Sequence, residues 1–113
     1  MGKVGRFVVD PKAGAWCDVT VDNGDKVTVN HDKGGFKGGQ LTLERKKWMG
    51  LSSERLFACD LDSPAGRAAL ARITAGIPAD SARATPLGAF AEFIKDCATP
   101  EDAKTKCEAL LRG

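Results

Sequence analysis

A chain of 113 residues with a net charge of +2 is long enough for one hydrophobic core and too short for two, so we expect a single domain over 1–113. Its apolar share of 42% and charged share of 28% are those of a globular protein and exclude a disordered chain. No apolar run approaches the roughly 20 residues of a membrane helix, and the first residues lack the apolar stretch of a signal peptide. These features predict a soluble, cytoplasmic protein without membrane contact.

The first half of the chain alternates between apolar and polar residues, as β-strands do. Residues 6–10 form a short β-prone run, and 12–14 are typical of a turn. Residues 16–31 hold alternating valines on both sides of the Asn23-Gly24 pair. This arrangement indicates a β-hairpin.

The register of this hairpin follows from the side chains that must share a face, because directly opposed residues of an antiparallel pair point to the same side. A two-residue Asn-Gly turn would oppose Val21 to Lys26, whereas a loop of three or five residues centred on Gly24 keeps one face apolar and the other polar. The expected pairs are Val21 with Val27, Val19 with Val29, and Thr20 with Thr28. We expect the ring of Trp16 to lie in the core.

The segment 32–40, DKGGFKGGQ, separates this hairpin from the next strand. It holds four glycines within six positions, which are too many for a strand interior and predict a mobile loop. Leucines alternate with polar residues over 41–44 and predict a strand that runs toward Trp48, before a turn at 52–53. A last strand is expected over 56–61, which is apolar on both faces and therefore typical of a central strand.

The second half of the chain changes from two-residue alternation to helical spacing. Three times a Ser or Thr precedes a proline, a pair in which the hydroxyl caps a helix and the proline fits its first turn. The pairs are Ser63-Pro64, Thr85-Pro86 and Thr99-Pro100. They predict three helices, the first over 64–75, with a linker over 78–84 before the second. The residues expected to face the core are Ala69, Leu70, Ile73 and Ile77, then Leu87, Phe90, Ile94 and Cys97, then Ala103, Cys107, Leu110 and Leu111.

Strands followed by helices predict an α+β fold. Within the single domain, 1–62 form the β-rich half and 63–113 the helical half. We expect an N-terminal antiparallel sheet or a partly open small barrel of about five strands, followed by three C-terminal helices packed on it. A barrel with a separate helical appendage is the alternative, but in a chain this short the helices are needed to cover the sheet.

The four cysteines, Cys17, Cys59, Cys97 and Cys107, lack the close pair that zinc sites use. Cys97 and Cys107 would lie about 10 Å apart along the axes of two successive helices, beyond the reach of a disulfide. In a cytoplasmic protein we therefore expect four buried thiols. The sequence predicts neither a metal site nor a cofactor.

Candidates for catalysis are few. The one histidine, His31, lies beside Asp32 at a strand end, and a dyad with Cys59 requires that the strands bring the two side chains together. Nothing in the local sequence marks either residue as catalytic, so we expect an exposed histidine and a buried cysteine. Asp60 and Asp62 form a carboxylate pair, but acidic residues just before a helix are expected from its dipole alone. We therefore do not expect an enzyme.

Basic residues gather over 33–55, where six Lys and Arg oppose two Glu, a local net charge of +4. The glycine-rich loop can cradle a phosphate with its backbone N–H groups and its lysines, and its phenylalanine can stack on a base. The loop matches neither a Walker motif nor a dinucleotide fingerprint. A flexible hairpin loop and a charged strand that resists edge-to-edge aggregation are the simpler interpretations. The candidate binding residues are Lys33, Phe36 and Lys37 in the loop and Arg45, Lys46, Lys47 and Trp48 in the strand.

These patterns leave the function open between three classes. The first hypothesis is a small binding module that takes an anion or nucleic acid through the glycine-rich loop and the basic strand. The alternative is a protein-interaction or assembly module, in which the helices or a patch of Trp48, Met49 and Leu51 dock a protein partner or a second copy. A small enzyme is the least favoured class.

Overall fold

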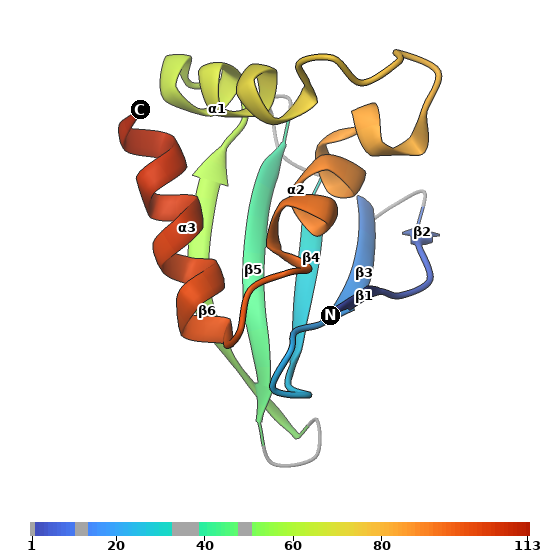
Figure 1. Ribbon diagram of the computed structural model, residues 1–113, viewed down its shortest axis with the longest axis vertical. Coiled ribbons are helices and arrows are strands. Elements are labelled where there is room, and N and C mark those ends of the chain that lie inside the picture. The colour runs from blue at the N-terminus through green and yellow to red at the C-terminus, as the bar shows by residue number, and fades with distance from the viewer. Residues whose placement is uncertain (1, 11–13, 33–38, 48–50) are drawn as a thin grey trace.

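The computed structural model describes residues 2–10, 14–32, 39–47 and 51–113. They form an α+β fold in which an antiparallel sheet is followed by helices that cover one of its faces (Figure 1). The strands are β1 Lys3–Val4, β2 Val8–Asp10, β3 Gly14–Thr20, β4 Lys26–Asp32, β5 Gln40–Lys47 and β6 Ser52–Asp60. The helices are α1 Pro64–Thr74, α2 Pro86–Ile94 and α3 Pro100–Arg112, with a short 3₁₀ helix, η2 Ala82–Ala84, in the predicted linker. The predicted fold class is confirmed.

The sheet is open rather than closed into a barrel, which decides between the two architectures that the sequence allows. β1 and β2 both pair with β3, and the order continues through β4 and β5 to β6. Every pairing is antiparallel. The six strands of the described residues thus occupy five positions across the sheet, close to the number expected from the sequence.

β6 lies at an edge of the sheet, so the central position predicted for it is wrong. The strand also begins earlier than predicted, because Ser52 and Ser53 pair with the end of β5 instead of forming a turn. The register with β5 shifts after Leu43, and this shift leaves Leu56 without an opposed residue. Leu56 and Phe57 are both buried. A β-bulge, rather than a central position, therefore explains the consecutive apolar residues.

The hairpin of β3 and β4 has the predicted parity but a different register. The observed pairs are Val19 with Val27, Cys17 with Val29, and Asp18 with Thr28. Within the loop, the N–H of Gly24 donates to the carbonyl of Val21 at 2.9 Å, and the N–H of Val21 donates to the carbonyl of Asp25 at 3.0 Å. Gly24 has a φ of 93°, so it ends the turn in the left-handed region instead of lying at its centre. The centre of the hairpin therefore lies one residue earlier than predicted, and the residue opposite each valine of β4 lies two positions earlier.

All three predicted helix starts are confirmed. The hydroxyl of Ser63 accepts a hydrogen bond from the N–H of Gly66 at 3.0 Å. Thr85 and Thr99 cap α2 and α3 in the same way. α2 lies over β3 and β4 and α3 over β6 on one side of the sheet, while α1 runs across the end of the strands and contacts both of these helices (Figure 1). Among the described residues no helix combines the length and the apolar character that crossing a membrane requires.

The core lies between the helices and one face of the sheet. Its largest fully buried side chains include Phe90 and Ile94 of α2 and Leu41 and Leu43 of β5. The predicted core positions Leu70, Ile73, Leu110 and Leu111 are partly buried and pack against this cluster. The other predicted helical core residues that the cluster contains are Leu87, Cys97, Ala103 and Cys107. The helix periodicity read from the sequence is thus confirmed, except at Ile77, which lies beyond the end of α1 and outside this cluster.

Two side chains of the hairpin lie on the faces opposite to those predicted. Trp16 opposes Asn30 on the face without helices and is 38% exposed, so its predicted place in the core is wrong. His31 opposes Leu41 on the helix side and is only 7% exposed, so the predicted exposed histidine is also wrong. Leu41 separates His31 from Cys59 in the register, which places the two about 10 Å apart across two strand spacings. This separation excludes a catalytic dyad.

The four cysteines are buried free thiols, as predicted. Burial raises the pKa of Cys17 to about 11 and that of Cys107 to about 12. Burial also raises the pKa values of Cys59 and Cys97. Because only a thiolate is an effective nucleophile, these thiols are packing groups at neutral pH.

Candidate binding face

The face of the sheet opposite the helices, here called the open face, presents mainly polar side chains, and most of them fall into four rows. In antiparallel strands, residues that oppose one another point to the same side, so the register identifies the rows. They are Lys3, Thr20 and Lys26; Asp18, Thr28, Glu44 and Arg55; Trp16, Asn30, Thr42 and Ala58; and Asp32, Gln40 and Asp60. The first row is basic and the last contains two carboxylates, so charge changes sign along the strands.

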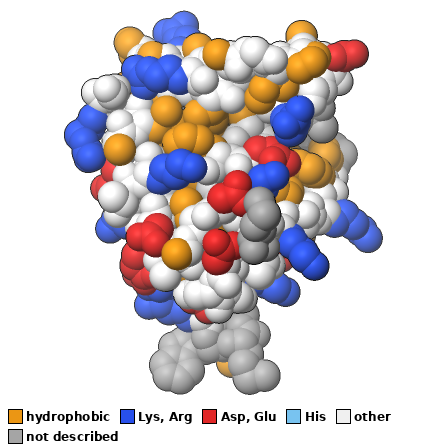
Figure 2. Space-filling model, in the orientation of Figure 1, with side chains coloured by type: hydrophobic (Ala, Val, Ile, Leu, Met, Phe, Trp, Pro, Cys, Tyr) orange, Lys and Arg blue, Asp and Glu red, His pale blue; other side chains and the backbone are white. Residues whose placement is uncertain are grey.

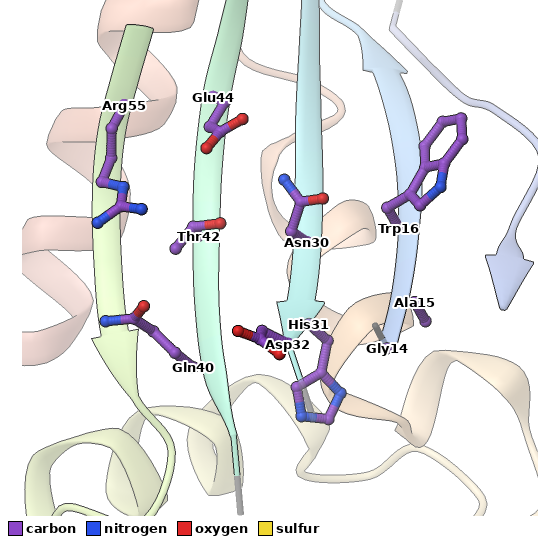
Figure 3. A pocket seen from close by; sticks show the side chains of 10 residues that line it. All are labelled: Gly14, Ala15, Trp16, Asn30, His31, Asp32, Gln40, Thr42, Glu44 and Arg55. Carbon is purple, nitrogen blue, oxygen red and sulfur yellow. The ribbon is translucent and has the colours of Figure 1, made fainter. Parts of the chain in front are cut away.

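The middle of the open face is hollowed. This polar hollow has a volume of about 340 Å³. Figure 3 shows its side chains projecting from β3, β4, β5 and β6, with the helices behind the sheet. The lining residues are Gly14, Ala15, Trp16, Asn30, His31, Asp32, Gln40, Thr42, Glu44 and Arg55. Amides, a hydroxyl, carboxylates and a guanidinium converge there, so the hollow offers hydrogen-bond donors and acceptors at short range.

A second hollow, of about 600 Å³, adjoins the first along the edge formed by β1 and β2. Its charged lining residues are Lys3, Arg6 and Lys26 against the single carboxylate of Asp18. Asp18 accepts a hydrogen bond from the hydroxyl of Thr28 at 2.7 Å, which holds this carboxylate against the sheet. The second hollow, here called the basic hollow, therefore carries an excess of positive charge.

Trp16 lines both hollows and is the aromatic residue between them. Its 38% exposure means that part of the indole is available for contact, while the sheet supports the rest. The indole therefore lies between the cations of the basic hollow and the hydrogen-bonding groups of the polar hollow.

The predicted basic strand does not present one basic surface. β5 alternates, so Lys46 opposes Ser53 on the open face, whereas Arg45 and Lys47 point to the helix side. Arg45 pairs with Glu54 at 2.8 Å and also with Glu101 of α3. Lys47 pairs with Glu54 at 2.7 Å. The other predicted site residues, Lys33, Phe36, Lys37 and Trp48, lie outside the described residues.

These ion pairs change the acidity of the groups involved. Hydrogen bonds from Arg45 and Lys47 lower the pKa of Glu54 to about 2. Hydrogen bonds to Glu54 and Glu101 raise the pKa of Arg45. Two of the three described cations of this strand are thus already matched by carboxylates. On the helix side as a whole, acidic and basic side chains are interspersed (Figure 2).

The residues of the two hollows were not identified from the sequence. Lys3 and Arg6 are separated from Lys26 by a whole strand, and only the pairing of β1 with β3 brings Lys3 opposite Thr20. The alternation of the hairpin could have indicated the position of Trp16, because this residue shares its strand face with Asp18 and Thr20 and not with the valines. The two-residue alternation along the strand by itself places the ring of Trp16 on the polar face.

In the carboxylate pair before α1, Asp60 and Asp62, the first residue has a structural role. The carboxylate of Asp60 accepts a hydrogen bond from the N–H of Asp62 at 2.9 Å, and the carbonyl of Asp60 accepts one from the hydroxyl of Ser63 at 2.7 Å. These bonds shape the turn that leads into the helix. Across the described part of the chain, no cluster of three or more His, Cys, Asp or Glu side chains is arranged to hold a metal ion.

Comparison with known protein families, with curated proteins and with solved structures finds no match to this chain.

Proposed function

We propose that this protein is a small nucleic-acid-binding module that takes a single strand on its open face. The observation that carries the proposal is the position of Trp16, which is partly exposed between a basic hollow and a polar hollow. Single-stranded nucleic acids require these same three features: a stacking surface, cations for phosphate and hydrogen-bonding groups for base edges.

Each part of the open face has a counterpart in such a ligand. A base stacks on the indole of Trp16, while Lys3, Arg6 and Lys26 lie within the neighbouring hollow for the backbone phosphates. Asn30 and Gln40 in the polar hollow supply donors and acceptors that match the edges of bases.

The row that contains Asp32 and Asp60 favours one orientation of the nucleic acid on the open face. Asp32 and Asp60 repel phosphate, so the backbone of the ligand follows the basic hollow and the bases point toward the carboxylates. Carboxylates accept hydrogen bonds from the amino groups of bases. In this proposal the anion-binding role expected from the basic strand moves to Lys3, Arg6 and Lys26.

The test is a titration of a labelled single-stranded oligonucleotide, followed by fluorescence anisotropy. Trp16→Ala is expected to remove about 1–3 kcal/mol of binding, a loss of affinity of about 5- to 150-fold, because one stacked base loses its platform. A duplex of the same sequence is expected to bind more weakly, since its bases are not available for stacking.

Lysine variants test the electrostatic half of the proposal. Lys26→Ala is expected to weaken binding and to reduce the slope of log affinity against log salt concentration by about 0.7, the contribution of one phosphate contact. Lys104→Ala is the matched control, because it removes an equal charge from an exposed position on α3. Binding that is absent at low salt, or that is equally strong in Trp16→Ala, would disprove the proposal.

A further inference from the structure

Exposed apolar side chains are concentrated at one edge of the sheet. Four large hydrophobic side chains are exposed among the described residues: Phe7 at 42%, Val9 at 71%, Trp16 at 38% and Leu51 at 89%. Val9 lies in β2, Phe7 directly precedes β2, and Trp16 lies in the neighbouring strand β3. Among the described strands, β2 pairs with β3 and with no other, so it is an edge strand. This edge therefore offers both unpaired backbone groups and apolar side chains.

The opposite edge of the sheet shows what a protected edge looks like in this protein. β6 carries charged residues such as Glu54, Arg55 and Asp60, and its pairing is interrupted by a bulge. Charges and bulges both discourage edge-to-edge pairing. β2 carries a charged residue, Asp10, only at its end, and its pairing with β3 runs without a register shift. The sequence therefore protects the β6 edge against edge-to-edge pairing more strongly than the β2 edge.

We propose that β2 pairs antiparallel with β2 of a second copy of this chain. The run of residues 6–10, RFVVD, is self-complementary about Val8. An antiparallel pairing centred there opposes Val8 to itself, Phe7 to Val9, and Arg6 to Asp10, a residue of opposite charge. A two-fold axis through Val8 generates this pairing, and isologous contacts of this kind are the commonest in homodimers.

Both faces of the strand are matched by this register. Val9 opposes Ala15 on the helix side, where Phe7 and Val9 line an apolar groove with Thr85, Pro86 and Leu87. Opposing Phe7 to the partner's Val9 covers the most exposed side chain of the edge with an aromatic ring. On the open face, Val8 opposes Trp16 and lines the basic hollow.

The geometry of the pairing sets the shape of the dimer. Because the two-fold axis is perpendicular to the sheet, the helices of both copies remain on one side and the two open faces form one continuous surface. The basic hollows of the two copies, each lined by Val8, become neighbours across the axis. The inference does not depend on the proposed function, since pairing is measured without any ligand.

Sedimentation velocity at protein concentrations up to about 200 µM tests the dimer, because this range fully reveals micromolar association. The wild-type chain is expected at twice the monomer mass. Val9→Glu is expected to weaken association at least about tenfold, because each copy would bury an unpaired charge at the interface. Leu51→Glu is the matched control, since Leu51 is also exposed but precedes β6, at the other edge of the sheet, and it is expected to remain dimeric.

A disulfide variant tests the register itself. Val8→Cys places one thiol of each copy opposite the other, and opposed residues of an antiparallel pair lie about 4.5–5.5 Å apart, within the range of disulfides. Because the four native thiols are buried, oxidation is expected to yield a covalent dimer from Val8→Cys and none from Leu51→Cys. A monomeric wild type, equal effects of Val9→Glu and Leu51→Glu, or equal cross-linking of the two cysteine variants would overturn the proposal.

Discussion

At the scale of single residues, Glu54 holds a cluster of charges together on the helix side of β5. It accepts from Arg45 and Lys47, and Arg45 in turn reaches Glu101 at the start of α3. These side chains are partly exposed to water, where individual ion pairs contribute little to stability. What the cluster does determine is the direction in which two basic side chains point, and they point away from the open face.

The depressed pKa of Glu54 predicts an acid dependence of stability. The pKa falls from an ordinary value of 4.5 to about 2 in the folded protein, so the ion pairs stabilise the fold above pH 4.5 and this contribution is lost as the pH falls toward 2. Glu54→Gln should therefore show a smaller decrease in the free energy of unfolding between pH 4.5 and pH 2 than the wild type. Urea titrations over this interval measure it, with Glu108→Gln as a control, and equal slopes for Glu54→Gln and wild type would contradict it.

At the scale of elements, α2 determines how the helical layer rests on the sheet. This helix of nine residues packs on β3 and β4 and contacts both other helices. Such a short helix is marginal in isolation, so its first turn depends on the capping bond from Gly88 to Thr85 and on the burial of Phe90 and Ile94. The cap and the apolar face are local features, and for this reason the sequence predicts the helix well.

Loss of this cap should destabilise the whole domain. Thr85→Ala removes the acceptor of the Gly88 N–H and is expected to lower the free energy of unfolding by about 1 kcal/mol. Thr105→Ala is the comparison, because this exposed threonine lies inside α3 and donates to the carbonyl of Glu101. Denaturant unfolding monitored by circular dichroism measures both variants. A loss for Thr85→Ala no larger than that for Thr105→Ala would show that the cap does not matter.

At the scale of the whole molecule, one core joins the two halves of the chain. Cys17 of β3, Cys59 of β6 and Cys107 of α3 belong to the same buried cluster, although they are far apart in sequence. The loop of the hairpin also docks on the helical layer, because the N–H groups of Asp22 and Asn23 donate to the carbonyls of Cys97 and Ala98. The sheet and the helices are therefore expected to unfold together.

Thiol reactivity reports on this cooperativity. All four thiols are buried and have raised pKa values, so the folded protein should react slowly with a thiol-specific reagent. In a denaturant series, the four thiols should become reactive together, at the midpoint of the unfolding transition seen by circular dichroism. A thiol that reacts well before this midpoint would reveal local opening of the helical layer.

The sequence by itself determined the features that depend on near neighbours. The three helix starts, the helical core positions and the parity of the hairpin are set by caps, spacing and turn chemistry within a few residues. These local preferences agree with the fold, and they were sufficient for the class and for the order of the elements.

Only the tertiary structure decided the pairings between distant segments. It placed β6 at an edge, turned Trp16 to the open face, brought Lys3 and Lys26 to the two sides of Thr20, and joined Arg45 to Glu101. Strand order and ion pairing across the core depend on which surfaces meet after the chain has collapsed, and no local window of sequence contains that information. The candidate binding face is built from these long-range pairings, and for this reason it could not be predicted from the sequence.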